Sequence, residues 1–274
     1  KQLTATWQNR REILTAVGRH VFVGIFYGTL WWRLGLGKVY ERIGVIFFSL
    51  VFVMIGNQQN IPRIFFDRLL FYREKGAGVY GAVEYWWSIG LAQLPLAVLN
   101  TCIYGSLLYF LAGFHNDTWK PFAYFMLVII LCNLIGLAFC QMLAAATRTQ
   151  DTAVSLFPIS LFFFIAFAGF IVRLPTLPDY LASWAPTISF ARWAMEGLVI
   201  NEFRGNEEAI FPVPEGIPIT PEQIYGAFLE AYGFGKVGDG GEILGWVLWI
   251  LLGNLVLFRL LGLLCLKYVT FERR

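Results

Sequence analysis

Residues 121–146, PFAYFMLVIILCNLIGLAFCQMLAAA, run from end to end without a charged side chain. An α-helix needs about 20 mostly apolar residues to span the hydrocarbon core of a bilayer, so this stretch is long enough to cross as one helix. Its apolar residues are continuous and do not alternate with polar ones, as they do in the strands of a membrane barrel. The stretch therefore predicts a membrane-spanning helix.

Five further runs share this character, at about 13–32, 43–61, 86–111, 153–172 and 243–267. The whole chain of 274 residues is 58% hydrophobic and 14% charged, whereas about 25% charge is usual for a soluble domain. Lipid cannot hydrogen-bond a peptide backbone, so only helices and closed barrels cross it. We therefore predict an all-α membrane protein with six transmembrane helices, forming one domain over residues 1–274.

Two other segments are expected to lie at the membrane without crossing it. Residues 2–12, QLTATWQNRRE, mix apolar and charged side chains and suit an amphipathic helix in the headgroup plane, although a plain charged flank of the first span fits equally well. Prolines interrupt the apolar stretch between the fifth and sixth spans, at Pro175, Pro178 and Pro186. We expect short helical pieces there that re-enter the membrane from outside.

The basic residues predict an orientation. Six spans place both termini on one side, where 12 Lys and Arg residues fall, against 8 on the other side and Arg259 within the last span. Cytoplasmic loops are enriched in these residues, although Arg33, Lys38 and Arg42 in the first loop argue the other way. We expect both termini in the cytoplasm and the acidic segment 173–242 outside.

Recognisable catalytic and metal-binding patterns are missing from the sequence. It has no GxxxxGK[ST], HExxH or GxSxG motif, and its cysteines lie singly in apolar runs, as small buried helix residues do. The spans have almost no ionisable residues at mid-membrane apart from Arg259, which weighs against an ion-coupled carrier. We expect Arg259 to snorkel to the headgroups, with a functional ion pair as the alternative. No catalytic residue, metal, cofactor or nucleic-acid partner is expected in this chain.

A polar segment, Phe71–Tyr80 (FYREKGAGVY), places three adjacent charges and two glycines between the second and third spans. The second span itself ends in four amides, Asn57–Asn60. Amide side chains are costly when they face lipid, so these residues either face a cavity or partner helix or lie in solvent beyond the span.

Two blocks of residues in this order resemble one protein family. The first runs from Asn57 through Asp67-Arg68 and FYREK (71–75) to Gln93-Leu94-Pro95, and the second joins Phe167–Ile171 to FARWAMEGL (190–198) and Asn201-Glu202-Phe203. Together they resemble the membrane domain of the G subfamily of ATP-binding-cassette exporters, the White and pleiotropic-drug-resistance group, which is of ABC-2 type. The resemblance covers nearly the whole chain.

Several partners follow from this resemblance. It implies a nucleotide-binding domain that carries ATP and Mg, either ahead of Lys1 in a longer chain or on a separate partner. A second membrane domain, identical, different or fused, would complete the translocation cavity, with membrane lipids around it. The implied cargo is hydrophobic or amphipathic, such as lipids, sterols or xenobiotics, and the expected location is the plasma membrane.

The resemblance also assigns residues, position by position. On the second and fifth helices, the implied cavity-lining residues are Phe52, Ile55, Pro158, Phe162 and Ile165. An outward gate is implied at Phe170 and Ile171, where the family usually has leucines. The segment between the second and third spans corresponds to the family's coupling helix, with contacts to the nucleotide-binding domain from Asp67, Arg68, Arg73, Glu74 and Lys75.

Two other functions remain open at this point. One is a permease subunit that exports polysaccharide or lipid-linked glycan with a separate ATPase. The other is a membrane subunit that anchors a partner and transports nothing. The anchor would not need a lined cavity, so substitutions at Phe162 or Ile55 distinguish it from a transporter.

Overall fold

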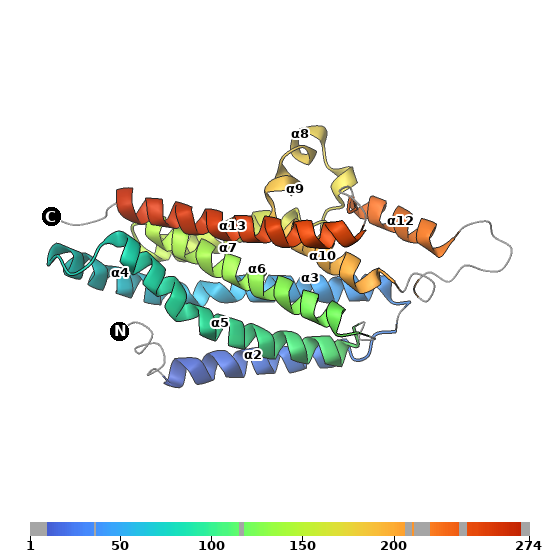
Figure 1. Cartoon of the computed structure of the whole chain (residues 1–274), viewed down its shortest axis with the longest axis horizontal. Coiled ribbons are helices and arrows are strands. Elements are labelled where there is room, and N and C mark those ends of the chain that lie inside the picture. Colours follow the sequence, from blue (N-terminus) through green and yellow to red (C-terminus); the bar gives the residue numbers. More distant parts are fainter. Residues whose placement is uncertain are drawn as a thin grey trace.

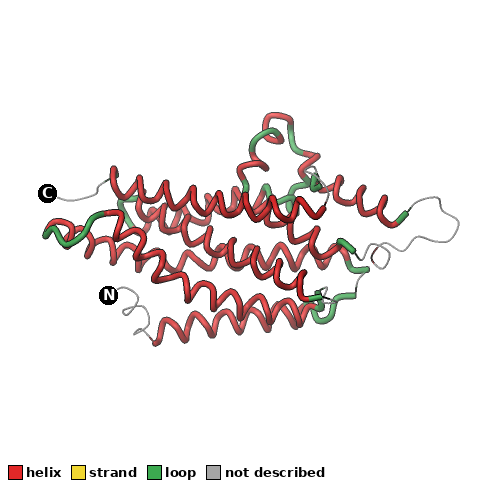
Figure 2. The backbone as a smooth tube through the Cα atoms, in the orientation of Figure 1, coloured by secondary structure: helices red, strands yellow, loops and turns green. Residues whose placement is uncertain are grey.

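A computed structural model of the chain describes residues 10–35, 37–114, 118–205, 210, 220–235 and 240–269. Within these ranges the regular structure is helical and there is no strand, which Figures 1 and 2 show. The predicted all-α class is confirmed for this part of the chain. Residues 2–9 of the expected amphipathic helix lie outside the described residues, and Arg10 already belongs to the first described helix.

The elements follow in this order: α2 (Arg10–Leu30), α3 (Val39–Ile55), η1 (Gly56–Asn60), α4 (Ile61–Gly76), α5 (Ala82–Ala112), α6 (Trp119–Ala146), α7 (Gln150–Ala166), η2 (Leu174–Thr176), α8 (Asp179–Ala182), α9 (Ala185–Ile188), α10 (Phe190–Phe203), α12 (Pro221–Tyr232) and α13 (Gly240–Tyr268). Long helices pack side by side into a bundle (Figure 1). The start of α2, the α4–α5 turn and the end of α13 lie at one end of this bundle.

Five helical stretches of the described chain are long and apolar enough to cross a membrane: Ile13–Leu30, Val39–Gly76, Ala82–Ala112, Trp119–Ala146 and Gly241–Tyr268. The fifth predicted span corresponds to α7, which is apolar but has only 17 residues. It ends at Ala166 because the chain turns at Gly169, whose φ of +91° is a left-handed conformation. A membrane protein is therefore supported by length and composition, and the count of six spans stays a prediction.

Helix α6, which contains residues 121–146, is the most buried of the five stretches. It packs against α3, α5, α10 and α13. Small residues on α6 permit this close approach: a Cβ added at Gly136 would lie 3.4 Å from the backbone of Met54 on α3. The core of the bundle therefore forms around α6.

The second predicted span and the polar segment after it form one continuous helical element. After α3 the backbone tightens into the 3-10 helix η1, which holds the amide-rich residues Gly56–Asn60. It then resumes as α4, with Pro62 in the first turn, where its missing N–H costs no hydrogen bond. The residues FYREK are the last turns of α4, and Gly78, with a φ of +73°, reverses the chain toward α5.

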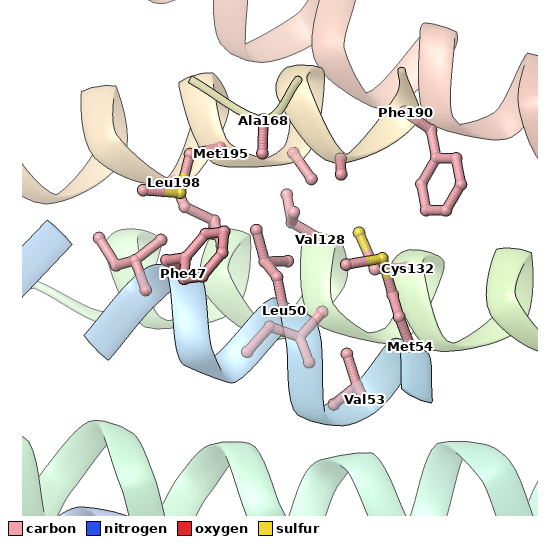
Figure 3. Packing of buried hydrophobic residues seen from close by; sticks show 14 of the residues in the cluster. Phe47, Leu50, Val53, Met54, Val128, Cys132, Ala168, Phe190, Met195 and Leu198 are labelled. Carbon is pink, nitrogen blue, oxygen red and sulfur yellow. The ribbon is translucent and has the colours of Figure 1, made fainter. Parts of the chain in front are cut away.

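The expected broken segment between the fifth and sixth spans is present as η2, α8, α9 and α10. The short helices α8 and α9 project from the side of the bundle (Figure 1). By contrast, α10 is buried along its length against α3, α6 and α13. Figure 3 shows Met195 and Leu198 of α10 beside Phe47 of α3.

Close helix packing predicts different effects for two glycines of α13. A Cβ at Gly262 would lie 2.2 Å from the ring of Trp86 and 3.2 Å from the backbone of Met142, whereas Gly253 has nothing within 4 Å. We expect Gly262→Ala to lower the free energy of unfolding by about 1–3 kcal/mol, because the added methyl overpacks the α5–α6–α13 contact. The matched change Gly253→Ala should be neutral or stabilising, since alanine favours a helix. Thermal unfolding in detergent measures both, and equal effects would contradict the packing described.

Candidate functional site

An open groove of about 730 Å³ runs along the side of α3. Phe52 and Ile55 line it together with Tyr27 of α2 and Val154 of α7. Ile55 is 44% exposed, while the ring of Phe52 is held from behind by Tyr104, with the ring centroids 4.5 Å apart. One end of the groove is polar, formed by Arg19 and the amides Gln58, Gln59 and Gln150. An apolar wall with a polar end is a suitable surface for an amphiphilic ligand.

The predicted cavity residues of α7 divide into two sets. Val154 lines the groove, and Pro158 and Phe162 follow it at steps of four residues, so all three lie on one helix face. Both Pro158 and Phe162 are exposed, the latter by 64%. Ile165 is 6% exposed and packs in the chain's own core. The structure therefore presents four of the five residues outward, along α3 and α7.

The two residues of the predicted gate follow α7 directly. The ring of Phe170 stacks on Phe47 of α3 at 4.6 Å between centroids. Gly169 has no room for a side chain, because a Cβ there would lie 2.9 Å from the ring of Phe234. Ile171 is 52% exposed. The turn after α7 is thus attached to α3 through Phe170, while Ile171 remains accessible.

Arg68, one of the five residues assigned to coupling, points into the protein. It is 5% exposed, and its Nη1 donates to the carbonyls of Ala144 (2.6 Å) and Thr147 (2.8 Å), while Nη2 donates to Arg148 (3.2 Å). These carbonyls end α6, where intrahelical donors run out and the helix dipole favours a cation. Arg68 therefore fixes α4 to the end of α6.

The other four coupling residues lie nearer the surface of α4. Asp67 pairs with Arg63 one turn earlier, with Nε and Oδ2 3.9 Å apart, and Lys75 lies 5.9 Å from the ring centroid of Phe71. Glu74 accepts a hydrogen bond from the hydroxyl of Tyr80. Burial, and then this bond to Glu74, raises the pKa of Tyr80 to about 12.

Arg73 is exposed at this end of the bundle. A small aromatic cluster supports the turn from beneath: Phe71 stacks on Tyr85 at 4.2 Å, and Trp86 and Leu266 complete it. The end of α4 is thus packed against this cluster, and the side chain of Arg73 is exposed on it.

Two buried ion pairs involve α10, one to α3 and one within α10 itself, and sequence reasoning missed both. Arg42 of α3 binds Glu202 of α10 and also donates to the carbonyl of Gly113 (2.9 Å). Arg192 lies 3.0 Å from Glu196, which accepts from the backbone N–H of Gly235 at 2.7 Å. Burial raises the pKa of Glu196, and Arg192 opposes that shift.

A signal for the second pair was available, because Arg192 and Glu196 are four residues apart in one helix. The sequence offered no signal for the first pair, because Arg42 and Glu202 are 160 residues apart.

Arg259 does not reach along α13 toward the headgroups as expected. Its Nη1 donates to Oε1 of Gln141 on α6 at 2.7 Å, and Gln141 in turn donates to Gln93 on α5 at 3.0 Å. Gly90 leaves space for the guanidinium, because a Cβ there would lie 2.2 Å from it. Because Gln141 is a neutral amide, this contact is a hydrogen bond and not the ion pair predicted as the alternative.

Comparisons with known proteins place this geometry in context. A family model described as ABC-2 type transporter matches residues 1–203. ABC transporter G family member 6 of Dictyostelium discoideum is 28% identical over 282 residues, covering 97% of this chain and 18% of that protein. ABC transporter G family member 44 of Oryza sativa subsp. japonica is 28% identical over 285 residues, covering 100% of this chain and 18% of that protein.

The pleiotropic drug resistance protein TUR2 of Spirodela polyrhiza is 27% identical over 225 residues, covering 79% of this chain and 15% of that protein. The chain thus spans less than a fifth of the length of each of these three relatives.

The contacts of Arg68 predict that replacing this buried side chain lowers the stability of the protein, whereas replacing an exposed arginine of the same helix does not. We expect Arg68→Met to lower the free energy of unfolding by at least about 1.5–3 kcal/mol, the usual contribution of a hydrogen bond to a charged group. Arg68→Lys should not restore it, because an ammonium cannot divide its donors across three carbonyls as a guanidinium does. Arg73→Met, at an exposed position of the same helix, is the control. Thermal unfolding in detergent tests the set, and an Arg68→Met protein as stable as the control would exclude the contact.

Proposed function

The chain belongs to the ABC-2 type transporter family, in its G subfamily, and from this premise we propose that it is the membrane domain of an ATP-driven exporter. The proposed cargo is a hydrophobic or amphipathic compound, such as a lipid, a sterol or a xenobiotic. One observation carries the proposal: the open groove beside Phe52 and Ile55, whose lining residue Val154 shares one face of α7 with the exposed Phe162.

The composition of the groove supports a cavity shared with a second membrane domain. Apolar side chains alone could face lipid, but the exposed amides Gln59 and Gln150 line the same groove. Amide groups facing hydrocarbon are costly, so this surface needs a partner or water over it. A second copy of the domain, or a related one, set against the α3 and α7 faces would enclose the groove.

A continuous helical element supports coupling to an ATPase. Gly76, at the end of α4, and Ile55, in the groove, belong to the same stretch Val39–Gly76, which is 38 residues long. Nucleotide-binding domains carrying ATP and Mg would contact the end of α4 near Arg73, and their closure would move this end. Because Arg68 fixes α4 to α6, such a displacement would pass into the bundle and bias it between inward-open and outward-open states.

A cavity function predicts an effect of the exposed aromatic on α7. We expect Phe162→Ala to change substrate-stimulated ATPase activity and export several-fold in proteoliposomes that contain the domain with its nucleotide-binding domains. The control is Phe22→Ala on α2, where a phenylalanine of similar exposure (69% against 64%) lines neither the groove nor the α7 face. If both variants behaved like the unchanged protein, the anchor subunit would be the better interpretation. A glycan permease would respond to Phe162→Ala only with glycan cargo.

A coupling role predicts a charge effect at the end of α4. We expect Arg73→Glu to reduce substrate-stimulated ATPase activity and export several-fold without changing the unfolding temperature, because the side chain is exposed. Lys267→Glu, an exposed basic residue at the end of α13, is the matched control. Full activity of the Arg73→Glu protein would remove the end of α4 from the mechanism.

A further inference from the structure

A second cavity, of about 350 Å³, lies between α2, η1, α5 and α6. Its walls carry three arginines, Arg11, Arg19 and Arg63, together with His20 and several amide side chains. Among the residues described by the structure, no aspartate or glutamate lines this space. The cavity therefore combines a concentration of positive charge with amide donors and acceptors.

Part of this polar wall is satisfied by its own contacts. Asn57 donates to Oδ1 of Asn133 at 2.8 Å, and Asn133 donates to Oγ1 of Thr101 at 2.6 Å. These three side chains link η1, α6 and α5 and need no ligand. Asn57 and Asn133 line the cavity, and fixed polar groups of this kind hold a binding site in shape.

Two other groups on the wall lack such partners. Arg19 donates through Nη1 to the neutral amide Gln59, while its Nε is buried and makes no hydrogen bond. Asn100 is 5% exposed, and its Oδ1 makes none. Arg63 differs from Arg19 because it has a carboxylate partner, with its Nε 3.9 Å from Oδ2 of Asp67. A half-buried cation facing a neutral amide, and a buried acceptor without a donor, are both costly arrangements.

The cavity and the groove beside Phe52 share three lining residues, Arg19, Gly56 and Gln59. Arg19 therefore stands between a cationic space on one side and an apolar wall on the other. A molecule with a charged head and an apolar body could place the head among the arginines and the body against Tyr27, Phe52 and Ile55.

We infer that the polar cavity binds the anionic headgroup of an amphiphile, with the apolar part of the same molecule lying in the groove. A phosphate, sulfate or carboxylate would accept from Arg19 and from the neighbouring arginines, as oxyanions do from guanidinium groups. A hydroxyl or ammonium on the same headgroup would donate to Asn100. Binding itself does not depend on the proposed function, and only the question of whether the amphiphile is exported rests on it.

The test measures binding of two fluorescent lipids with the same acyl chains to the complete protein in nanodiscs. One probe is phosphatidylglycerol, which is anionic and carries hydroxyls, and the other is phosphatidylcholine, which is zwitterionic. We expect the anionic lipid to bind about tenfold more tightly, and Arg19→Gln to remove most of that difference, because one charge-assisted contact is lost. Arg10→Gln, an exposed arginine outside the cavity lining, should leave the difference unchanged.

Further measurements separate the possible sources of the anion. Inorganic phosphate alone should not displace the lipid at millimolar concentration, whereas displacement would show a site for a free anion and overturn the amphiphile. Equal affinity for the two lipids in the unchanged protein would overturn the inference without any variant, even if Arg19→Gln failed to fold. ATP-dependent movement of bound phosphatidylglycerol in the complete transporter would identify it as cargo. Binding without movement would identify a resident lipid, leaving the site intact and counting only against anionic lipid as the cargo.

Discussion

Hydrocarbon offers no hydrogen-bond partners, and this constraint decides where the chain can place its polar side chains. A buried polar group within the bundle is costly unless it finds a partner in the protein. Arg68 finds three carbonyls at the end of α6, Asn57 finds Asn133, and Arg42 finds Glu202. Each of these contacts joins elements far apart in sequence. Apolar packing brings the helices together, while the polar contacts fix which helix end meets which.

The same constraint connects the structure to transport. An exporter must move between states without exposing unpaired polar groups, so its helices must move as units whose internal contacts persist. The element from α3 through η1 to α4 is held to α6 at one end by Arg68 and to α10 at the other by Arg42, and in the proposed exporter these two contacts would persist. Its groove-facing residues lie between these two attachments. The polar cavity behind Arg19 lies beside the same element, at η1.

The sequence predicted much of the fold and less of the site. Apolar runs located the long helices because hydrophobic length is a local property, and prolines located the broken segment before α10. The buried position of Arg68 could also have been predicted from the sequence. The apolar residues Ile61, Ile64 and Phe71 are at helical spacing with it, and all four lie on the buried face of α4. The family resemblance instead assigned Arg68 to contacts with the nucleotide-binding domain, which would require an exposed side chain. The pairing of Arg42 with Glu202 and the direction of Arg259 could not be predicted, because both depend on how distant helices meet.

The 3-10 geometry of η1 has a mechanical consequence of its own. A 3-10 helix rises about 2.0 Å and turns about 120° per residue, against about 1.5 Å and 100° for an α-helix. Over the five residues of η1, the difference amounts to about 2.5 Å of length and about 100° of rotation. Winding η1 into α-helix would draw α4 toward α3 and twist the two against each other. In the link between the groove and the far end of α4, a change in the length of η1 is therefore coupled to a rotation of α4 about the helix axis.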